Sequence, residues 1–253
     1  QGTTIIKFSP VQIGTSSWSQ VAAGLSHSLG ILTTGALYGW GFNGQGQLGD
    51  GTFTNKSSPV QIGAGGSWIM LSLADDNVST NALMYGIRTD YSLYGWGLNQ
   101  IVPIYGTDSV SRSSPTLVRP IGSHYSVPTQ LPSDLFSTGV SWTQISASNS
   151  YSGAINSNGN LYMWGAGPVG QIGDGTTTTK SLPVQIAGNW STIKTGTNSV
   201  AAINTTNQLY TWGALTGDGT TISKSAPVQI TGSWNNVGIG ISYITAIRSP
   251  YNT

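Results

Sequence analysis

Residues 36–52 read A-L-Y-G-W-G-F-N-G-Q-G-Q-L-G-D-G-T, an aromatic segment followed by a glycine-rich run that contains an aspartate. Taken alone, such a run fits a phosphate-binding loop, a cation site or a structural turn. Related stretches recur at residues 161–176 and 209–220, so this one is a copy of a repeated segment. A segment with several copies is more simply explained by the architecture of a repeat protein than by the chemistry of one site.

The nine tryptophans of the 253-residue chain fall into two classes with regular spacing. Members of the first class follow Ser or Asn, and members of the second lie in the pattern L-Y-x-W-G. The first class comprises Trp18, Trp68, Trp142, Trp190 and Trp234, and the second comprises Trp40, Trp96, Trp164 and Trp212. The step from the first class to the second is 22 residues in three copies and 28 residues in the second copy, which indicates an internal repeat.

Two further markers recur in the same order along the chain. The pattern S-P-V-Q-I or a close variant surrounds Pro10, Pro59, Pro115, Pro183 and Pro227. The pattern G-D-G-T occupies residues 49–52, 173–176 and 217–220. Its second glycine precedes the next marker proline by eight residues, and Gly2 precedes Pro10 by the same eight. The first residues of the chain therefore read as the tail of a repeat.

Each unit of the repeat reads as four short segments of strand-forming residues separated by turn residues. In the first unit these segments are 18–23, 27–32, 36–41 and 59–62. Four strands in a unit of about 40–50 residues are the pattern of a propeller blade. We find no segment with the 3.6-residue hydrophobic period of a helix. The sequence therefore predicts an all-β chain.

The ordered motifs resemble the RCC1 (regulator of chromosome condensation) repeat over nearly the whole chain. The resemblance implies a single RCC1-like β-propeller domain over residues 1–253, with about five four-stranded blades. The expected repeats cover residues 16–63, 66–122, 140–188, 189–232, and 233–253 together with 1–14, with an insertion at about 119–139. Variants this rich in Thr, Ser and Gly are similar to bacterial secreted and bacteriophage members of the family rather than to eukaryotic nuclear members.

The fifth unit lacks a third strand in this count. Aligning Trp234 with Trp18 places Thr253 opposite Leu37, where the third strand of the first unit begins, and residues 1–14 supply the fourth strand. Three interpretations stay open. Five blades close with one defective blade, the sequence is an excerpt of a longer chain, or another polypeptide supplies the missing strand by β-augmentation.

The composition excludes several classes of protein. Charged residues make up 7% of the chain against a usual figure of about 25%, and the net charge is +1, so no basic surface for nucleic acid is predicted. The chain has no cysteine, and therefore no disulfide or thiolate metal site. No apolar run reaches the length of about 18 residues that membrane insertion requires. Abundant tryptophan and tyrosine argue against a disordered chain.

The residues that suggest chemistry have structural explanations. The glycine-rich loop lacks the Gly-Lys-Ser/Thr of a phosphate-binding loop. Asp50, Asp174 and Asp218 lie one to a turn, which favours hydrogen bonding within the loop over cation binding. His27 occupies a repeated structural position, and the other histidine, His124, lies in the insertion. We therefore expect no enzymatic activity, no cofactor and no metal site.

The second unit departs most from the repeat and is where we expect partner binding. Its loops at 75–81 and 100–109 differ from those of the other units, and the insertion follows it. Inserted loops on a rigid scaffold commonly carry function. The candidate partner-binding residues are Asp75, Asp76, Asn77, Ile104, Tyr105, His124, Tyr125 and Phe136. A protein, a surface glycan or other virion subunits are the expected partners, with no nucleic acid and no membrane insertion, and the gap in the fifth unit is a second place for a partner.

The sequence favours a non-enzymatic binding or structural propeller. The expected role is a virion or cell-surface component, such as a phage tail, fibre or decoration protein, that mediates attachment or subunit interaction. Its expected location is the virion or the extracellular surface. One alternative is a secreted inhibitor like the β-lactamase inhibitor of the family. The other is an exchange factor for a small GTPase, which the low charge disfavours because that role brings basic partners such as chromatin.

Overall fold

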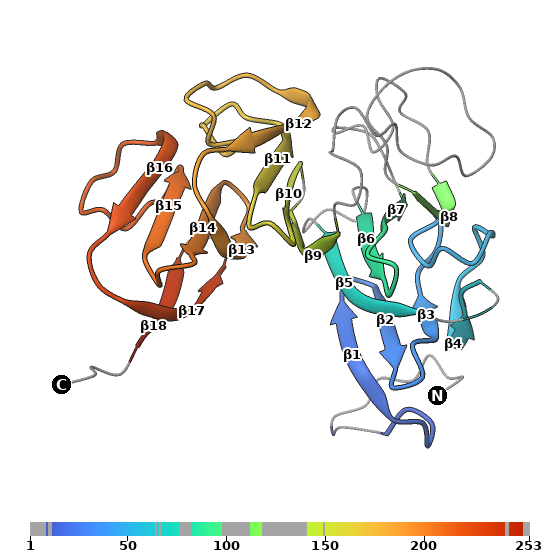
Figure 1. Ribbon diagram of the computed structural model, residues 1–253. Coiled ribbons are helices and arrows are strands. Elements are labelled where there is room, and N and C mark those ends of the chain that lie inside the picture. The colour runs from blue at the N-terminus through green and yellow to red at the C-terminus, as the bar shows by residue number, and fades with distance from the viewer. Residues whose placement is uncertain are drawn as a thin grey trace. The chain divides into compact units, whose positions relative to one another are not determined.

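All helices and strands in the part that the computed structural model describes are β-strands, joined by turns and loops (Figure 1). The described residues are 9, 12–63, 65, 67–75, 82–97, 112–117, 141–148, 150–240 and 243–249. They form eighteen strands in five antiparallel sheets, each of which we call a blade and number in chain order. The predicted all-β class with about five blades is confirmed.

Blades 1 and 2 each contain four strands in sequential order. Blade 1 is β1 (Trp18–Ala23), β2 (His27–Leu32), β3 (Leu37–Gly41) and β4 (Lys56–Gln61). Blade 2 is β5 (Trp68–Asp75), β6 (Ala82–Arg88), β7 (Leu93–Gly97) and β8 (Arg112–Leu117). The fourth strand of blade 1 begins three residues before the predicted start at Pro59, because Lys56 pairs with Gly41 across a bulge.

Blades 3 and 4 repeat this arrangement, and blade 5 contains two described strands. Blade 3 is β9 (Trp142–Ala147), β10 (Tyr151–Asn156), β11 (Leu161–Gly165) and β12 (Lys180–Ile186). Blade 4 is β13 (Trp190–Thr195), β14 (Ser199–Asn204), β15 (Leu209–Gly213) and β16 (Lys224–Ile230). Blade 5 is β17 (Trp234–Ile239) paired with β18 (Ile244–Arg248). Most of residues 1–14 lies outside the described residues, so their place in blade 5 stays a prediction.

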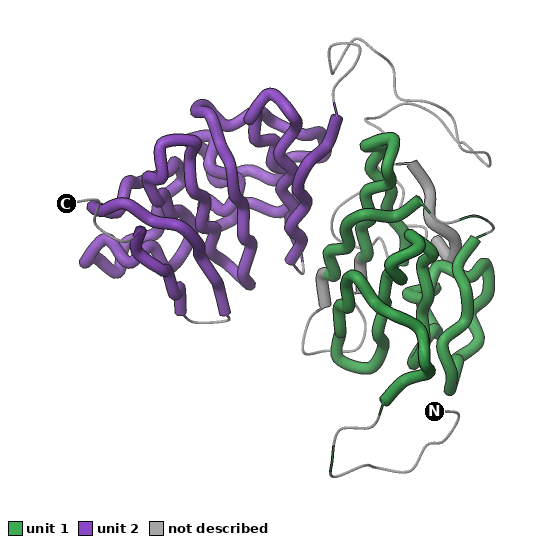
Figure 2. The backbone as a smooth tube through the Cα atoms, turned by 60° about the horizontal axis from the view of Figure 1, so that its bottom comes forward, with its two compact units in different colours: residues 1–100, 109–117 green, residues 101–108, 118–253 purple. Residues whose placement is uncertain are grey.

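The chain divides into two compact units (Figure 2). Unit 1 consists of residues 1–100 and 109–117 and holds blades 1 and 2. Unit 2 consists of residues 101–108 and 118–253 and holds blades 3, 4 and 5. No helix long and apolar enough to cross a bilayer occurs in the described segments of either unit.

The core of each unit lies between consecutive blades. Side chains alternate between the two faces of a strand, so each blade offers one set of residues to the blade before it and another to the blade after it. In unit 1, Leu29 and Ile31 of β2 share a buried cluster with Trp68, Leu71 and Trp96 of blade 2. The hydrophobic positions that recur in the sequence therefore form the contact between consecutive sheets of a unit: one set comes from the earlier blade and the other from the later blade.

The glycine that ends the L-Y-x-W-G strand has a steric reason. Gly165 has a φ of +116°, and a Cβ built on it would lie 2.5 Å from the carbonyl oxygen of Ser150. Gly213 has a φ of +96°, and its Cβ would lie 2.3 Å from the carbonyl oxygen of Asn198. Any other L-residue would clash with the turn between the first two strands, so the position requires glycine.

Candidate functional site

The contact between blades 3 and 4 shows the repeated interface in complete form. Tyr151 and Ile155 of blade 3 lie in one buried cluster with Trp190, Ile193 and Trp212 of blade 4. The ring of Trp190 packs edge-on against Tyr210 and lies at a centroid distance of 6.0 Å from Trp212. The repeat tryptophans of blade 4 therefore pack between this blade and the one before it.

A glycine-rich loop of the preceding blade holds the tryptophan of the third strand in blades 2 and 4. Trp212 Nε1 donates to the carbonyl oxygen of Gln171 at 2.8 Å, and Trp96 Nε1 donates to that of Gln47 at 3.0 Å. A Cβ on Gly173 would lie 2.6 Å from Trp212 Nε1, so the loop approaches the indole more closely than a side chain allows. The glycine-rich run at 44–51 therefore accepts a hydrogen bond from the tryptophan of the next blade and is not a phosphate site. We call this contact between the loop and the indole a clasp.

A glutamine adds a second link between neighbouring first strands. Gln20 Nε2 donates to the carbonyl oxygen of Leu71 at 3.0 Å, and Leu71 N donates to Gln20 Oε1 at 2.9 Å. Gln144 reaches the backbone of Ser191 and Ile193 in the same way. The side-chain amide of Gln20 thus makes the pair of hydrogen bonds to Leu71 that the backbone of an adjacent strand would make. This role was not predicted from the sequence, although W-x-Q recurs in two units.

The hydroxyl of Tyr151 completes the link from blade 3 to blade 4. It donates to the carbonyl oxygens of Gly196 at 2.7 Å and Ser199 at 2.8 Å. Burial raises the pKa of this phenol well above its ordinary value, so Tyr151 stays protonated and acts as a donor. The tyrosine at this position therefore stabilises the contact of its blade with the blade that follows.

The aspartates of G-D-G-T accept hydrogen bonds within their own loops, as predicted. Thr52 donates to Asp50 Oδ1 from its backbone nitrogen at 2.9 Å and from its hydroxyl at 2.8 Å, and Lys56 Nζ lies 3.2 Å from Asp50 Oδ2. Burial alone would raise the pKa of Asp50, but the bonds from Thr52 and Lys56 outweigh it and hold the pKa below 3.8. The lysine partner was not predicted from the sequence.

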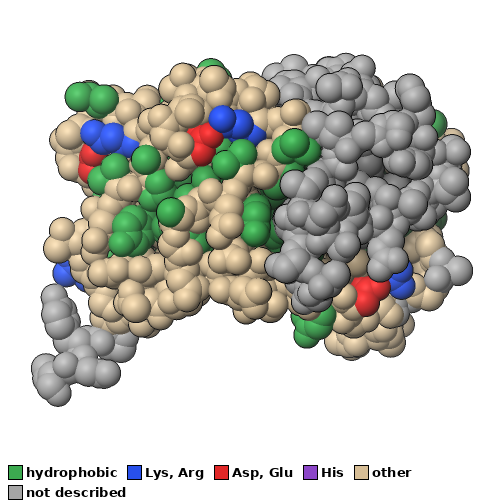
Figure 3. Space-filling view, turned by 45° about the horizontal axis from the view of Figure 1, so that its top comes forward, with side chains coloured by type: hydrophobic (Ala, Val, Ile, Leu, Met, Phe, Trp, Pro, Cys, Tyr) green, Lys and Arg blue, Asp and Glu red, His purple; other side chains and the backbone are tan. Residues whose placement is uncertain are grey.

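The other two copies of this loop have the same arrangement. Lys180 Nζ lies 2.7 Å from Asp174 Oδ2, and Lys224 Nζ lies 3.2 Å from Asp218 Oδ2. On the surface drawn in Figure 3 the acidic side chains have basic side chains next to them, and most of the remaining surface is uncharged. These charges are therefore neutralised locally and form no extended field for a charged partner.

His27 is a buried structural residue. Its Nε2 lies 3.3 Å from Met84 Sδ of the next blade, and the side chain is 3% exposed. Among the described residues, no group of three or more His, Cys, Asp or Glu side chains is placed to hold a metal ion.

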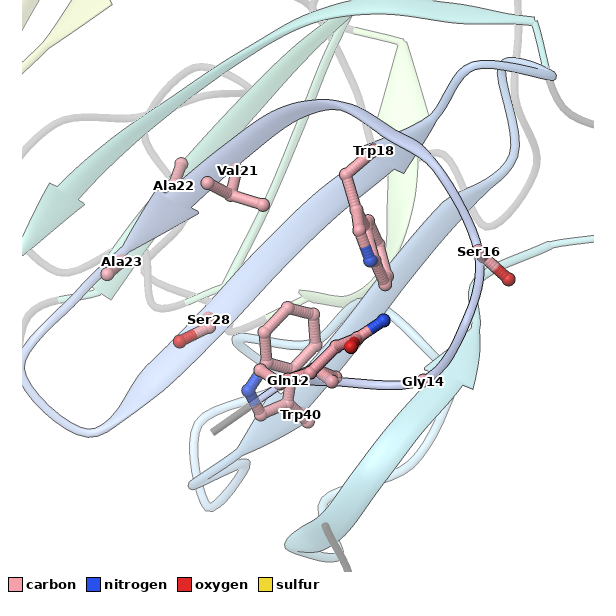
Figure 4. Close-up of a pocket in the computed structure, with 10 residues that line it drawn as sticks. Gln12, Gly14, Ser16, Trp18, Val21, Ala22, Ala23, Ser28 and Trp40 are labelled. Carbon is pink, nitrogen blue, oxygen red and sulfur yellow. The ribbon is translucent and has the colours of Figure 1, made fainter. Parts of the chain in front are cut away.

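The tryptophan face of blade 1 differs from these complete interfaces and forms the candidate site, which we call the Trp18 face. Trp18, Val21, Ser28 and Trp40 line a pocket of about 600 Å³ together with residues 12–14 and 16 (Figure 4). Ile13 contributes to the lining beside Trp18. In the close-up, the Trp18 and Trp40 rings point into the hollow that the chain at Gly14 and Ser16 borders.

Exposure shows that the Trp18 face is open. Val21 lies three residues after Trp18 and is 65% exposed. The residues at the same position of blades 2, 4 and 5 are Leu71, Ile193 and Val237, which are 5%, 1% and 3% exposed. The indole N–H of Trp40 has no acceptor among the described residues, whereas Trp96 and Trp212 have a loop carbonyl. This face therefore offers apolar surface, two aromatic rings and a hydrogen-bond donor to a binding partner.

The candidate partner-binding residues predicted from the sequence are not in this site. Asp75 is the last residue of β5, and its side chain is not among the described ones. The other seven, Asp76, Asn77, Ile104, Tyr105, His124, Tyr125 and Phe136, lie outside the described residues, so their role stays a prediction. The Trp18 face was missed because its tryptophans match the repeat, and their spacing does not reveal which copy is left uncovered.

Comparison with known proteins supports the architecture. The model of the "Regulator of chromosome condensation (RCC1) repeat" matches residues 18–47 in one version and residues 34–76 and 158–203 in another. The chain is 27% identical over 170 residues to the ultraviolet-B receptor UVR8 of Arabidopsis thaliana, and this match covers 67% of the chain and 34% of UVR8. It is 25% identical over 168 residues to human HERC4, a probable E3 ubiquitin-protein ligase, and this match covers 66% of the chain and 14% of HERC4.

Solved structures share the fold. Human WBSCR16 matches with a TM-score of 0.76 at 23% identity, over 95% of this chain and 60% of that one. Prp20p of Saccharomyces cerevisiae matches with a TM-score of 0.72 at 18% identity, over 94% of this chain and 58% of that one. The chain thus spans about a third of UVR8 and less than two thirds of either solved structure. Residues 18–76 and 158–203 thus match the RCC1 repeat, and the chain has the fold of an RCC1-like β-propeller.

Proposed function

We propose that the protein is a non-enzymatic binding scaffold that recognises another protein through the Trp18 face. The observation that carries this proposal is the exposure of Val21 beside the open pocket that Trp18 and Trp40 line. Uncovered aromatic and aliphatic surface of this kind is typical of protein-binding sites, where Trp and Tyr contribute most of the binding energy.

The residues that could perform chemistry support a binding role because structural contacts occupy them. Asp50 binds Thr52 and Lys56, Tyr151 binds two backbone carbonyls, and His27 lies against Met84. Similar proteins also suggest protein partners. The structure of Prp20p is described together with its binding to Gsp1p and histones, and another describes Kap60 bound to yeast RCC1.

We further propose that the protein is a virion or cell-surface component, such as a phage tail, fibre or decoration protein, that mediates attachment or contact between subunits. The small charged fraction and the richness in Thr, Ser and Gly support this location, because such variants of the repeat are similar to bacterial secreted and bacteriophage members of the family. An apolar Trp18 face suits contact with a neighbouring subunit.

A photo-cross-linking amino acid at position 21 tests both parts of the proposal. The Val21 variant is produced in the source culture, the culture is separated into virions, cell envelope and soluble fractions, and the cross-linked products are identified by mass spectrometry. We expect a protein adduct from position 21 in the virion or envelope fraction. The same amino acid at Ile222, which is 67% exposed in a loop, is the matched control.

The identity of the adduct decides between functions. A virion or surface protein supports the proposal, an enzyme would favour an inhibitor, and a small GTPase would favour an exchange-factor-like role. If position 21 gives no protein adduct beyond that of the Ile222 control, the Trp18 face is not a recognition surface and the proposal is wrong.

A further inference from the structure

We propose that the turn between β6 and β7 binds a neutral saccharide (Figure 1). This turn, residues 88–92, belongs to blade 2, and we call it the Tyr91 turn. The proposal is carried by Arg88, Asp90 and Tyr91, which differ from the residues at the same positions of blades 1, 3 and 4. The turn lies at the end of a hairpin within unit 1, and the inference does not depend on the Trp18 face.

Tyr91 has a backbone conformation that a tyrosine rarely adopts. Its φ is +61°, and the residues at the same position of blades 1, 3 and 4 are Gly35, Gly159 and Asn207, with φ values of +83°, +77° and +62°. Glycine and asparagine tolerate this left-handed region, whereas a bulky side chain there is strained. Tyr91 is also 44% exposed, so packing in the core does not explain its presence. A strained and exposed aromatic residue points to a functional role.

The residues that hold the Tyr91 turn also differ from those of blades 3 and 4. There, Asn156 and Asn204 hold the turn, because each side-chain oxygen accepts from the backbone nitrogens two and four residues later at 2.8–3.0 Å. Blade 2 has Arg88 at this position, and Asp90 closes the turn instead by accepting from the nitrogen of Ser92 at 3.0 Å and from its hydroxyl. Because Asp90 holds the turn, the side chain of Arg88 has no part in closing it.

Aromatic rings hold the guanidinium of Arg88 in place. Its Cζ lies 5.9 Å from the ring centroid of Trp68 and 5.7 Å from that of Tyr94, and Nη1 donates to the Tyr94 hydroxyl at 3.4 Å. The buried Nε has no acceptor in the part of the chain that the structure describes, and no described carboxylate forms an ion pair with the guanidinium. The lysine beside each G-D-G-T loop, by contrast, is paired with an aspartate. Arg88 is therefore a positioned hydrogen-bond donor with unused capacity.

Asp90 supplies an acceptor beside this donor. Burial alone would raise its pKa, but hydrogen bonds from Ser92 and the charge of Arg88 outweigh the burial and lower the pKa below 3.8, so the carboxylate is ionised at neutral pH. Both bonds from Ser92 end on Oδ1, so the lone pairs of Oδ2 can accept from a ligand. Arg88 and Asp90 thus present a donor and an acceptor with no net charge.

The chemistry of these side chains selects the ligand. An anion would bind Arg88 but meet the negative charge of Asp90, and a cation would bind Asp90 but meet the positive charge of Arg88, so a neutral ligand is favoured. A sugar hydroxyl both donates and accepts, so two neighbouring hydroxyls can satisfy the guanidinium and the carboxylate together. The exposed ring of Tyr91 offers a flat apolar face on which the C–H face of a pyranose can pack. A neutral saccharide therefore uses all three side chains.

The surface beside the Tyr91 turn suits a ligand longer than one sugar. Trp68 N donates to the carbonyl oxygen of Gly35 at 3.0 Å, which places the turn between β2 and β3 beside the first strand of blade 2. That turn carries two exposed threonines, Thr33 and Thr34, and no charged residue. Their hydroxyls extend the polar surface from blade 2 to blade 1 without adding a charge.

Retention on immobilised polysaccharides tests the site. Dextran, mannan, galactan and chitin supply neutral sugars of different stereochemistry, and polysialic acid supplies an anionic one. We expect the wild type to be retained on at least one neutral polymer and Tyr91→Asn to be retained about tenfold or more weakly. Tyr91→Asn introduces the residue type that blade 4 uses and relieves strain, so the midpoint of thermal unfolding should rise by about 2–4 °C. Loss of binding with a gain of stability distinguishes a ligand contact from a structural role.

The turn of blade 3 provides the matched control. Asn158 occupies the position of Asp90, is exposed, and lies in a turn with no aromatic or charged residue. Asn158→Ala should leave retention unchanged, whereas Asp90→Asn, which keeps the acceptor for Ser92 and removes the charge, should weaken it on the neutral polymer. A wild type that binds none of the neutral polymers or only polysialic acid, or a Tyr91→Asn variant that loses stability, would overturn the inference.

Heteronuclear NMR locates the bound sugar. The Nε–H group of Arg88 is buried, so its signal exchanges slowly with water and can be assigned by its loss in Arg88→Lys. An oligosaccharide of the retained polymer should shift this signal and the amides of residues 89–92 in a saturable way and leave the Arg248 signal unchanged. Shifts confined to the Trp18 face would overturn the inference. The protein adduct from position 21 should persist in Tyr91→Asn, so failure of either proposal leaves the other standing.

Discussion

Blades 4 and 1 carry the same pair of tryptophans on the same face, and the two faces differ in what covers them. Trp212 is fully buried and donates to the Gln171 carbonyl of the preceding blade. Trp40 occupies the same position of blade 1, is partly exposed, and borders an open pocket with Val21. One repeated surface therefore serves as core in one blade and as a candidate binding site in another, depending on its neighbour.

This difference has an energetic meaning. In a covered interface the tryptophan contributes packing, a hydrogen bond to a loop and the exclusion of water, which together account for much of the stability of a blade pair. In the open interface the same side chain packs on Trp18 but lacks a hydrogen bond to any described loop and part of the burial, so we expect it to contribute less to folding. The following predictions test that division.

The largest expected effect comes from Trp96→Ala compared with Trp40→Ala, because both tryptophans lie in unit 1. Trp96 is fully buried and donates to the Gln47 carbonyl, so its removal should lower the free energy of unfolding by about 3–5 kcal/mol. Trp40→Ala should cost about 1–2 kcal/mol, since the side chain is partly exposed. Urea denaturation at low protein concentration measures both, and equal losses would show that the open face is as important for folding as the covered one.

The second prediction concerns the loop that clasps Trp212. Gly173 and Gly175 have nearly equal φ values of +84° and +86°, but only at Gly173 would an added Cβ come within contact distance of Trp212. Both alanine variants should lose about 1–2 kcal/mol from backbone strain. Gly173→Ala should lose about 1–3 kcal/mol more because it collides with a buried indole.

Thermal unfolding and tryptophan fluorescence of these two variants distinguish strain from collision. The fluorescence of Gly173→Ala should change because Trp212 must move, and that of Gly175→Ala should stay as in the wild type. If the two variants have the same stability, the glycine-rich loop is an ordinary turn and not a clasp.

The third prediction removes the glutamine link between blades 1 and 2. Gln20→Ala leaves the Leu71 N–H and carbonyl without their side-chain partner, which should cost about 1–3 kcal/mol. Gln61→Ala, at an exposed position of β4, is the control and should change stability by less than about 0.5 kcal/mol. Hydrogen exchange of the Leu71 amide should accelerate in the first variant alone, and unchanged exchange would show that the link contributes nothing.

The repeat predicted the fold closely because each part of its consensus sequence performs a local structural task. The first tryptophan packs on the L-Y-x-W-G strand, the glycine after that strand avoids the Ser150 turn, and Asp50 closes its own loop. These tasks need only neighbouring residues, so sequence spacing reveals them. The start of β4 at Lys56 was missed because it depends on a bulge and on the ion pair with Asp50.

The candidate site was less accessible to prediction. The Trp18 face has the residues of a core position, and only the exposure of Val21 in three dimensions shows that it is uncovered. The irregular second unit stood out because unusual loops are visible in a sequence, whereas an uncovered copy of a regular surface is not.

The smallest expected effect is the pH dependence that Asp174 confers on the loop clasping Trp212. Burial alone would raise the pKa of Asp174, but Lys180 and Thr176 outweigh it and lower the pKa below 3.8. A carboxylate with a lowered pKa in the folded state stabilises the protein above its unfolded pKa, and this contribution is lost as the pH falls through the folded value. Stability should therefore be constant near neutral pH and decline below about pH 4.

Asp174→Asn removes this contribution and should lower the free energy of unfolding by about 1 kcal/mol at pH 7, because the ion pair with Lys180 is partly exposed and solvent screens it. The difference from the wild type should vanish at the acid end, where Asp174 is protonated in both folded and unfolded chains. Asp218→Asn removes the equivalent carboxylate, whose pKa is also lowered, by hydrogen bonds from Thr220 and Thr216, so it should show a loss of the same sign that also vanishes in acid. Urea denaturation between about pH 2.5 and pH 7 measures all three proteins, and a difference that persists unchanged in acid would show that Asp174 acts through loop shape and not through its charge.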